Sequence, residues 1–515
     1  MTSPCISRSK LPLNPHQIKV VEFLERDKVR GLLVVHGVGT GKTLTGVTVS
    51  QCFLDKYPES EVIVVTPTSL QKNFIKELKA YLGVEEYKDP RYRFFTIQGF
   101  TQAIKKGTIR PSDCEDSLLI IDEAHNIRTQ ITDESEDVDK CNDKTLTGVN
   151  ARALIEASKH ARKVLLLSAT PLVNRPCELI NLMSIVDGVN PISVQTFNKI
   201  SYEDYFKCKV SFYETSATHR KENYPSVVDK DVFIKMTPSY YKLYQRIEEH
   251  GGPDERAFYN GVRKGSNALE NDDSPKINWV MSHISKSKKE DKYVIFSHFI
   301  GAGLNMLMRR LDKKDISYVH VTGDISMKNR ERAVTNYNNG KVKVMLISKA
   351  GGEGLDLKNT KNVILLEPSW NESTHDQVIG RAVRYKSHFS LPKAEQKVKV
   401  FRLFHIKPAE ELFIEKATAE LWTKDEEAGN HLSVDLFLRN FSKKKQVKID
   451  EFIDILKSVS IEKKKCTKTT PFQRPRSPKK LVKSPRKTTK SAKKSVRKSR
   501  KTKSVKKSTS KKSSK

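Results

Sequence analysis

Two blocks of the chain repeat one pattern, in which a short apolar run is followed by a longer stretch with the apolar spacing of a helix. The apolar runs cover residues 32–35, 61–66, 92–96, 117–121 and 164–168 in the first block, and 292–297, 317–322, 342–348 and 362–366 in the second. Such runs are typical of strands buried on both faces, and the helical stretches between them indicate β-α-β crossovers. The pattern therefore predicts two parallel sheets.

We expect an α/β protein with two parallel-sheet domains in tandem. The two domains are predicted at residues 1–189 and 276–425. A C-terminal helical extension is predicted at residues 426–461, and a tail at residues 462–515. Between the two domains, residues 190–275 lose the strand rhythm, which predicts a partly helical insertion and linker. Residues 130–148 are acidic and polar and predict a loop.

A glycine-rich turn joins the first predicted strand to a helix. Glycines at 37, 39 and 41 let the backbone N–H groups converge on phosphate oxygens, and the positive end of the helix adds to the attraction. Lys42 would reach the phosphates and Thr43 would hold Mg²⁺. The strict form of this motif has a glycine where this chain has His36.

Polar clusters follow three strands of the first block, at the sheet edge where ligands of parallel sheets bind. Residues 66–70 offer hydroxyls and a helix N-terminus that suit a nucleic-acid backbone, and residues 168–171 follow the last strand. Asp122 and Glu123 are adjacent, so that one carboxylate can hold the metal while the other acts on the attacking water. The alternative is an acidic helix cap.

The second block carries two further clusters. Residues 351–356 are glycine-rich and acidic and follow a predicted strand, and residues 377–384 lie on a predicted helix. Arg381 and Arg384 stand three residues apart, which predicts one helical face and suits a phosphate or a transition-state charge. A surface pair of salt bridges is the alternative. Ahead of the loop, the Gln17 carboxamide can both donate to and accept from an adenine edge.

The formal net charge of +33 is concentrated at the C-terminal end. Residues 463–515 hold 24 Lys or Arg and no Asp or Glu, which leaves +9 for residues 1–462. This composition predicts a disordered segment that binds polyanions. Ser-Pro followed by two basic residues, at Ser477 and Ser484, resembles linker-histone tails. A nuclear-import signal and a solubility tail are the alternatives.

Seven cysteines are scattered without a Cys-x-x-Cys pair or any Cys/His cluster at ligand spacing. This spacing predicts reduced thiols and no structural metal. No apolar run reaches about 18 residues and no signal peptide is present, so we expect an intracellular protein without membrane contact.

Taken in order, these motifs resemble the superfamily 2 helicase and translocase motors, and within them the Swi/Snf-like branch. The resemblance covers residues 10–425 and rests on Gln17 and on residues 39–43, 66–70, 122–125, 168–171, 295–297, 351–354 and 377–384. Glu353 and Asp356 depart from the Swi/Snf pattern. The compact body also looks similar to the nucleoside triphosphatase I and early-transcription-factor ATPases of large nucleocytoplasmic DNA viruses.

The resemblance implies two RecA-like domains that bind ATP and Mg²⁺ between them and act on nucleic acid, with duplex DNA favoured. It implies Glu123 as the base, Asp122 and Thr43 as Mg²⁺ ligands, Arg384 as an arginine finger beside Arg381, and Lys42 on the phosphates. The implied nucleotide contacts are Gln17, Gly37, Gly39, Thr40, Gly41, Lys42, Thr43, Gly354, Asp356 and Gln377. The implied nucleic-acid contacts are Thr66, Pro67, Thr68, Ser69, Ser297, Ser348 and Trp370, with Ser168, Ala169 and Thr170 coupling the two events.

Three functions follow as hypotheses. The favoured one is an ATP-driven translocase on duplex DNA, serving viral transcription or genome handling with transcription machinery as a partner, in a virion or nucleus. The second is a strand-separating DNA or RNA helicase or a restriction-type motor subunit, although the short stretch between Asp356 and Gln377 leaves little room for a separating hairpin. The third is an architectural DNA-packaging protein.

Overall fold

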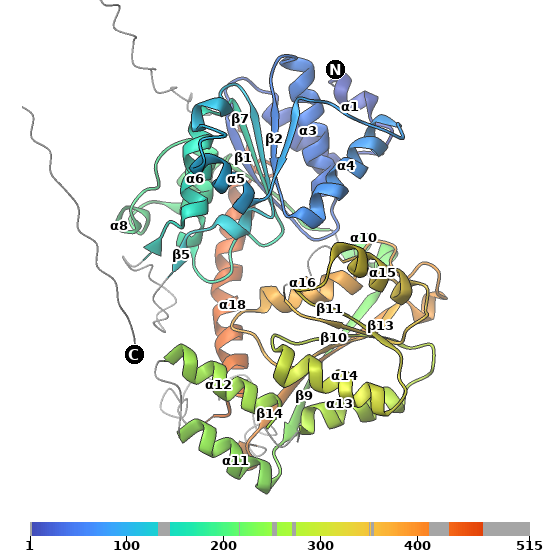
Figure 1. Ribbon diagram of the computed structural model, residues 1–515. Helices are drawn as coiled ribbons and strands as arrows, with labels where there is room; N and C mark the ends of the chain where they lie inside the picture. The colour runs from blue at the N-terminus through green and yellow to red at the C-terminus, as the bar shows by residue number, and fades with distance from the viewer. Residues whose placement is uncertain are drawn as a thin grey trace, which may run out of the picture. The chain divides into compact units, whose positions relative to one another are not determined.

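The computed structural model describes residues 3–131, 145–215, 217–249, 255–269, 274–349, 351, 355–410 and 432–466 (Figure 1). Residues 467–515 of the predicted tail, most of the predicted acidic loop and Gly354 lie outside these residues, whereas residues 462–466, predicted as the start of the tail, are described. Two six-stranded parallel sheets, each flanked by helices, form two lobes. The predicted α/β fold with tandem RecA-like domains is confirmed.

The first lobe is built on a sheet with the strand order β3-β2-β4-β7-β1-β8. Its strands are β1 (Gly31–His36), β2 (Val62–Val65), β3 (Tyr92–Phe95), β4 (Leu118–Asp122), β7 (Lys163–Ser168) and β8 (Val210–Tyr213). Its helices are α1 (Pro4–Arg8), α2 (Pro15–Leu24), α3 (Lys42–Lys56), α4 (Thr68–Leu82), α5 (Ile97–Lys105), α6 (Val149–His160), α7 (Ile180–Asp187), α8 (Val194–Phe197) and α9 (Tyr202–Phe206). A short antiparallel pair, β5 (Gln130–Ile131) and β6 (Thr145–Leu146), lies outside the main sheet.

The second lobe has the strand order β11-β12-β10-β13-β14-β9. Its strands are β9 (Ser226–Lys235), β10 (Lys292–Phe296), β11 (Tyr318–Val321), β12 (Val344–Ile347), β13 (Thr360–Leu365) and β14 (Lys397–Ile406). Its helices are α10 (Ala217–Asn223), α11 (Pro238–Glu249), α12 (Glu255–Asn267), α13 (Pro275–Ser285), α14 (Met306–Lys313), α15 (Met327–Asn338) and α16 (Glu372–Ala382).

Each sheet separates two apolar cores because successive side chains of a strand point to opposite faces. In β1, Leu33 and Val35 join the core on one face, and Leu32 and Val34 join the core on the other. All six residues of β1 are buried. The continuous apolar run that predicted this strand is therefore explained by burial on both faces.

The segment predicted as an insertion and linker contributes to both sheets. Residues 190–275 supply β8, which pairs with β1, and β9, which pairs with β14 over ten positions. The same segment holds α11 and α12, so it is partly helical as predicted. Strand β9 was missed because its residues are exposed or half-buried and include charged residues, so that it has no apolar run.

A long helix, α18 (Val434–Val459), belongs to both lobes. Val434 and Leu438 pack in an apolar cluster with α11 and α12, whereas Phe452 and Leu456 pack in a core of the first lobe. Among the described residues, no helix is long and apolar enough to cross a membrane.

The prediction of reduced thiols is wrong for five cysteines of the described part of the chain, one of which is Cys177. Disulfides join Cys5 to Cys52 and Cys208 to Cys466, with Cα–Cα distances of 5.1 and 5.7 Å. The paired cysteines are 47 and 258 residues apart in sequence. Sequence spacing could not reveal these pairs because only the fold brings them together.

Candidate active site

The glycine-rich loop closes tightly between β1 and α3. Gly39 and Gly41 have φ values of 79° and 82°, a left-handed backbone that glycine adopts at low cost. A Cβ at Gly41 would also lie 2.6 Å from the amide nitrogen of Gln17. The Lys42 ammonium donates hydrogen bonds to the carbonyls of His36 at 3.0 Å and Gly37 at 3.1 Å. The loop thus has the predicted shape, with its lysine folded over it.

Gln17 lies against this loop on α2 and is 1% exposed. Its side-chain oxygen accepts from the backbone of Asn14 at 2.7 Å, and its nitrogen donates to the Gly41 carbonyl at 3.0 Å. Thr40 is buried, and its hydroxyl donates to the Gly37 carbonyl at 2.7 Å. These contacts place Gln17 beside the loop, and its contact with adenine stays a prediction.

The two adjacent carboxylates stand at the carboxyl end of β4. Asp122 is buried, and Glu123 has a left-handed backbone with φ of 53°, held by a 2.9 Å hydrogen bond from its N–H to the Asp122 carboxylate. Left-handed backbone at a non-glycine residue is costly and concentrates at functional sites. Glu123 also precedes a short 3-10 helix, Ala124–Ile127, as its N-cap residue, and its role as the base stays a prediction.

The two carboxyls have different proton affinities. Burial and the neighbouring Glu123 raise the pKa of Asp122. Burial also acts to raise the pKa of Glu123, but the hydrogen bond and charge of His125, together with Lys42, outweigh it and lower that pKa. The His125 ring nitrogen lies 3.2 Å from the Glu123 carboxylate. Glu123 is thus held ionised, the state in which a carboxylate can accept a proton, although a lowered pKa also makes it a weaker base.

The predicted magnesium ligands fit a divalent cation. Thr43 lies in the first turn of α3 and Asp122 ends β4, and both offer the oxygen ligands that Mg²⁺ prefers. Burial and the adjacent Glu123 raise the pKa of Asp122 because they make its negative charge unfavourable. A bound cation would offset this unfavourable charge.

Helix α16 brings residues of the second lobe to the loop. The Gln377 side chain donates to the Thr170 hydroxyl at 3.4 Å, and a Cβ at Gly380 would lie 3.5 Å from Val38 of the loop. The charges of Arg381 and Arg384 both act to lower the pKa of Lys42, after the larger effect of its burial. The second lobe therefore places two cations beside the phosphate loop.

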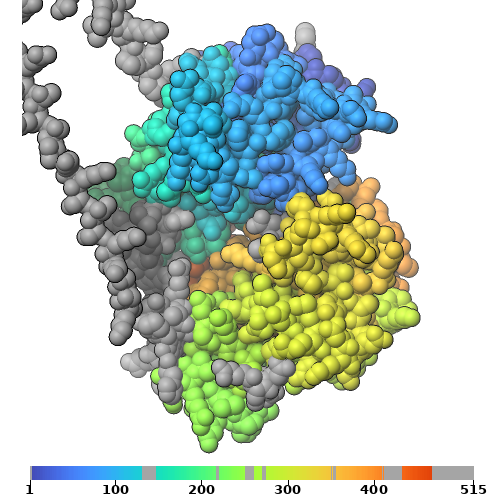
Figure 2. All heavy atoms as spheres, in the orientation of Figure 1, coloured from blue at the N-terminus to red at the C-terminus, as the bar shows by residue number. Residues whose placement is uncertain are grey.

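Further contacts join the lobes. Lys72 of α4 and Glu331 of α15 form an ion pair of 2.9 Å, and the space-filling view shows the first lobe in blue to cyan and the second in green to orange (Figure 2). In the coupling segment, the Thr170 N–H donates to the Ser168 hydroxyl at 3.2 Å, with Ala169 between them. Thr170 is thus held from one lobe and contacted from the other.

Arg384 does not share a helical face with Arg381, which corrects the prediction. Helix α16 ends at Ala382, and the Arg384 N–H donates to the Ser387 hydroxyl at 3.3 Å, which turns the chain out of the helix. The Arg384 guanidinium donates to the Gly380 carbonyl at 3.3 Å and lies 3.9 Å from the Asp356 carboxylate. Burial lowers the pKa of Arg384, against the charges of Asp356 and Glu123.

The predicted nucleic-acid contacts divide into two groups. Pro67, Thr68 and Ser69 are half-buried or exposed at the start of α4, next to the buried Thr66. Their contact with nucleic acid stays a prediction.

Ser297, Ser348 and Trp370 lie differently. Ser297 and Ser348 are buried, and the Ser297 hydroxyl donates to the Glu367 carboxylate at 3.1 Å. Trp370 is half-buried and packs on Phe441, with ring centroids 5.8 Å apart. The contact of these three residues with nucleic acid stays a prediction.

Several residues around the loop were missed. The Tyr224 hydroxyl lies 3.2 Å from the position of a Cβ at Gly39, and its ring centroid lies 6.0 Å from that of Tyr385, next to Arg384. The His16 ring stacks on Tyr213 at 3.6 Å, and its Nε2 lies 3.0 Å from the Thr40 carbonyl. No sequence signal marks these residues, since Tyr213 and Tyr224 come from the segment predicted as a linker.

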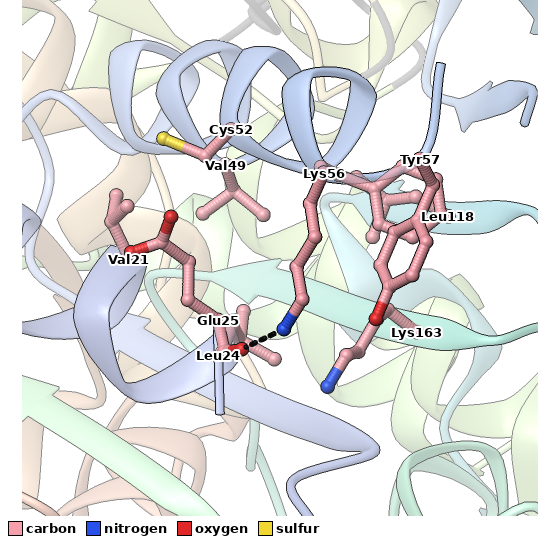
Figure 3. A pocket seen from close by; sticks show the side chains of 10 residues that line it. Val21, Leu24, Glu25, Val49, Cys52, Lys56, Tyr57, Leu118 and Lys163 are labelled. Atoms are coloured by element: carbon pink, nitrogen blue, oxygen red, sulfur yellow. Dashed lines mark hydrogen bonds between the residues drawn. The ribbon is translucent and has the colours of Figure 1, made fainter. Parts of the chain in front are cut away.

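A separate cavity of about 20 Å³ lies between α2, α3 and the amino ends of β4 and β7 (Figure 3). Glu25, Lys56 and Lys163 contribute polar groups to its lining, and the Lys56 ammonium donates to the Glu25 carbonyl at 2.9 Å. Parallel strands carry their ligand sites at the opposite end. The cavity is the size of a water site, so it is not a nucleotide site.

The phosphate loop, the carboxylate pair and the two arginines on and just after α16 of the second lobe define a P-loop nucleoside triphosphatase with two RecA-like lobes. Residues 10–173 match the family described as type III restriction enzyme, res subunit, and residues 275–386 match the helicase conserved C-terminal domain.

Three relatives come from large DNA viruses. A putative ATP-dependent RNA helicase of Acanthamoeba polyphaga mimivirus is 31% identical over 478 residues, which cover 83% of this chain and 98% of the relative. A termination factor NPH-I homolog of African swine fever virus is 23% identical, over 73% of this chain and 69% of the relative. Nucleoside triphosphatase I of Choristoneura biennis entomopoxvirus is 22% identical, over 85% of this chain and 77% of the relative. The chain belongs to the superfamily 2 helicases, among the members found in large DNA viruses.

Proposed function

We propose that this helicase-family nucleoside triphosphatase is an ATP-driven translocase on duplex DNA. The observation that carries the proposal is the contact of α16, which holds Arg381 and ends two residues before Arg384, with the first lobe: Gln377 donates to the Thr170 hydroxyl at 3.4 Å, and a Cβ at Gly380 would lie 3.5 Å from Val38 of the loop. A site assembled from two lobes couples each hydrolysis event to their relative movement, which is the basis of stepping along a strand.

ATP would bind with its phosphates on the loop, held by Lys42 and by the backbone N–H groups at the start of α3. Glu123, held by His125, would accept the proton of the attacking water. Arg384 would leave the weak contact with Asp356 and stabilise the charge of the transferred phosphoryl group. Thr43 and Asp122 would hold Mg²⁺, which supplies charge neutralisation of the phosphates.

The stretch after Asp356 supports translocation over strand separation. Strand β13 (Thr360–Leu365) and a short connection to α16 occupy residues 357–371, and within this described stretch no hairpin projects from the lobe. The basic tail supports a polyanionic track, because neutralising phosphates by Lys and Arg gives binding without sequence preference. The viral relative named as a termination factor suggests work beside transcription machinery.

A second candidate is a strand-separating helicase on RNA, favoured by the relative whose name describes a putative ATP-dependent RNA helicase. A strand separator would displace one strand of a duplex, whereas a translocase would remove a bound third strand and leave the duplex intact.

The test is steady-state ATP hydrolysis by the full chain in enough salt to weaken the tail, with duplex DNA, single-stranded DNA, duplex RNA or no nucleic acid. Stimulation by duplex DNA above the other tracks, with triplex displacement and no strand separation, supports the proposal. Stimulation by RNA with strand separation supports the second candidate. The Glu123→Gln variant is the control for contaminating ATPases.

A further inference from the structure

His36 occupies the loop position where the strict motif has glycine, and its ring is fully buried. Burial, with smaller effects of His16 and Lys42, lowers the pKa of His36 to about 2, so the ring is neutral. Its Nε2 lies 2.8 Å from the Ser211 hydroxyl in β8, and its carbonyl accepts from the Lys42 ammonium at 3.0 Å. One residue thus contacts β8 with its side chain and the phosphate-binding lysine with its backbone.

The Ser211 hydroxyl is also engaged by a carboxylate from the far end of the chain. Ser211 donates to one oxygen of Glu462 at 2.6 Å, and the Phe212 N–H donates to the other at 2.8 Å. A hydroxyl has one proton and a carboxylate can only accept, so Ser211 must accept from His36. Glu462 therefore selects the tautomer of His36 that carries its proton on Nε2.

Three contacts fasten the segment that carries Glu462 to the first lobe. The Ile461 N–H donates to the Val210 carbonyl at 2.9 Å, and the Lys19 ammonium donates to the Glu462 carbonyl at 3.4 Å. The disulfide between Cys208 and Cys466 closes the segment four residues beyond Glu462. Glu462 is thus bracketed by a backbone hydrogen bond and a covalent bond.

The same corner of β8 supports the loop by a second route. The Gly37 N–H donates to the Tyr213 carbonyl at 3.0 Å. Glu462 fixes Ser211 and Phe212, the two residues before Tyr213, so it controls both the ring of His36 and the backbone that receives Gly37. A charged acceptor that satisfies two donors is stronger than a neutral one.

We propose that Glu462 is a positioning residue for ATP binding, which acts through Ser211 and His36 to hold the phosphate loop in its binding shape. The inference rests on the proposed function, in which this loop binds ATP. It assigns a role in the nucleotide site to the segment that follows α18, outside both family matches. Because Glu462 acts through Ser211 and Phe212 and not on the loop directly, its loss should weaken ATP binding more than it slows the chemical step.

The test compares the full chain with Glu462→Ala, Glu462→Gln and Cys466→Ser, using equilibrium binding of a fluorescent ATP analogue and steady-state kcat and KM. Glu214→Gln is the matched control, since Glu214 is an exposed acidic residue in the same region whose carboxylate pairs with Lys457. We expect Glu462→Ala to raise the analogue Kd and the KM about tenfold, with kcat changed less than about threefold. Glu462→Gln should have a smaller effect in the same direction, as should Cys466→Ser.

A double-mutant cycle of Ser211→Ala and Glu462→Ala tests the relay itself, because residues in one hydrogen-bonded chain have non-additive effects. Additive losses, or unchanged analogue binding in a folded Glu462→Gln variant, would overturn the inference. Equal losses in the Glu214→Gln control would also overturn it. Absence of ATPase activity in the wild-type chain would instead refute the proposed function, so the two failures are distinguishable.

Discussion

Removal of the Arg384 guanidinium tests the site most directly. In the structure this group lies 3.9 Å from Asp356, whose side chain is 55% exposed. An ion pair so exposed is worth at most about 1 kcal/mol, so Arg384 can leave it at little cost when a phosphate is present. Against a transferred phosphoryl group about 4 Å away, at an effective dielectric constant of about 20, a single charge contributes about 4 kcal/mol.

Each 1.36 kcal/mol or so changes a rate tenfold, so Arg384→Ala should lower kcat about 10³-fold. This value agrees with the lower end of the range for arginine fingers, about 10³ to 10⁵. The KM for ATP should change little, because the group acts mainly in the transition state. Asp356→Asn, the control, should change kcat less than about fivefold.

The assay is single-turnover hydrolysis with saturating enzyme, with ATP analogue binding measured in parallel. If Arg384→Ala loses less than about tenfold while Arg381→Ala loses about 10³-fold, the finger is Arg381 and the assignment is wrong. If both variants lose binding and not kcat, the two arginines serve to bind ATP and do not stabilise the transition state.

Three further results are expected. Glu123→Gln should bind ATP but lose at least about 10²-fold in turnover, and wild-type turnover in single-turnover hydrolysis would exclude Glu123 as the base. Asp435→Ala should destabilise the second lobe by about 3 to 5 kcal/mol in urea unfolding, because it leaves the fully buried Lys276, 2.5 Å from Asp435, without its counter-charge; a loss below about 1 kcal/mol would contradict this reasoning. If about 6 to 10 cations of the tail engage phosphates, affinity for duplex DNA should fall roughly 10³- to 10⁵-fold between about 50 and 200 mM salt in a binding titration, and a chain that ends after Cys466 should show a clearly shallower dependence.

Sequence predicted the parts of the fold that depend on local pattern. Every apolar run of the two blocks is a strand, and the clusters around Lys42, Asp122 and Ser168 lie at strand ends because parallel strands share one ligand-binding edge. Strand β9 escaped prediction because charged residues at a sheet edge break the apolar run, and its Asp229 pairs with Arg402 of β14 at 3.0 Å.

The rest of the site depends on contacts between residues far apart in sequence. Ser211 and Glu462, separated by 251 positions, meet only because β8 joins the first sheet beside β1. Arg384 was placed on a helix by its three-residue spacing from Arg381, but the helix ends at Ala382 with Val383 as its C-cap, before Arg384 is reached. Spacing rules describe regular structure and cannot foresee where it ends.

Helix α18 limits how the two lobes can move relative to each other. It has 26 residues and is therefore about 39 Å long, and its first turns are packed in the second lobe while its last turns are packed in the first. A helix resists stretching, so the two lobes cannot be pulled apart along its axis without exposing Leu438 or Phe452 to water. In the proposed translocase, relative motion of the lobes would then be a swing about this helix, and the length of each step would be set by an angle.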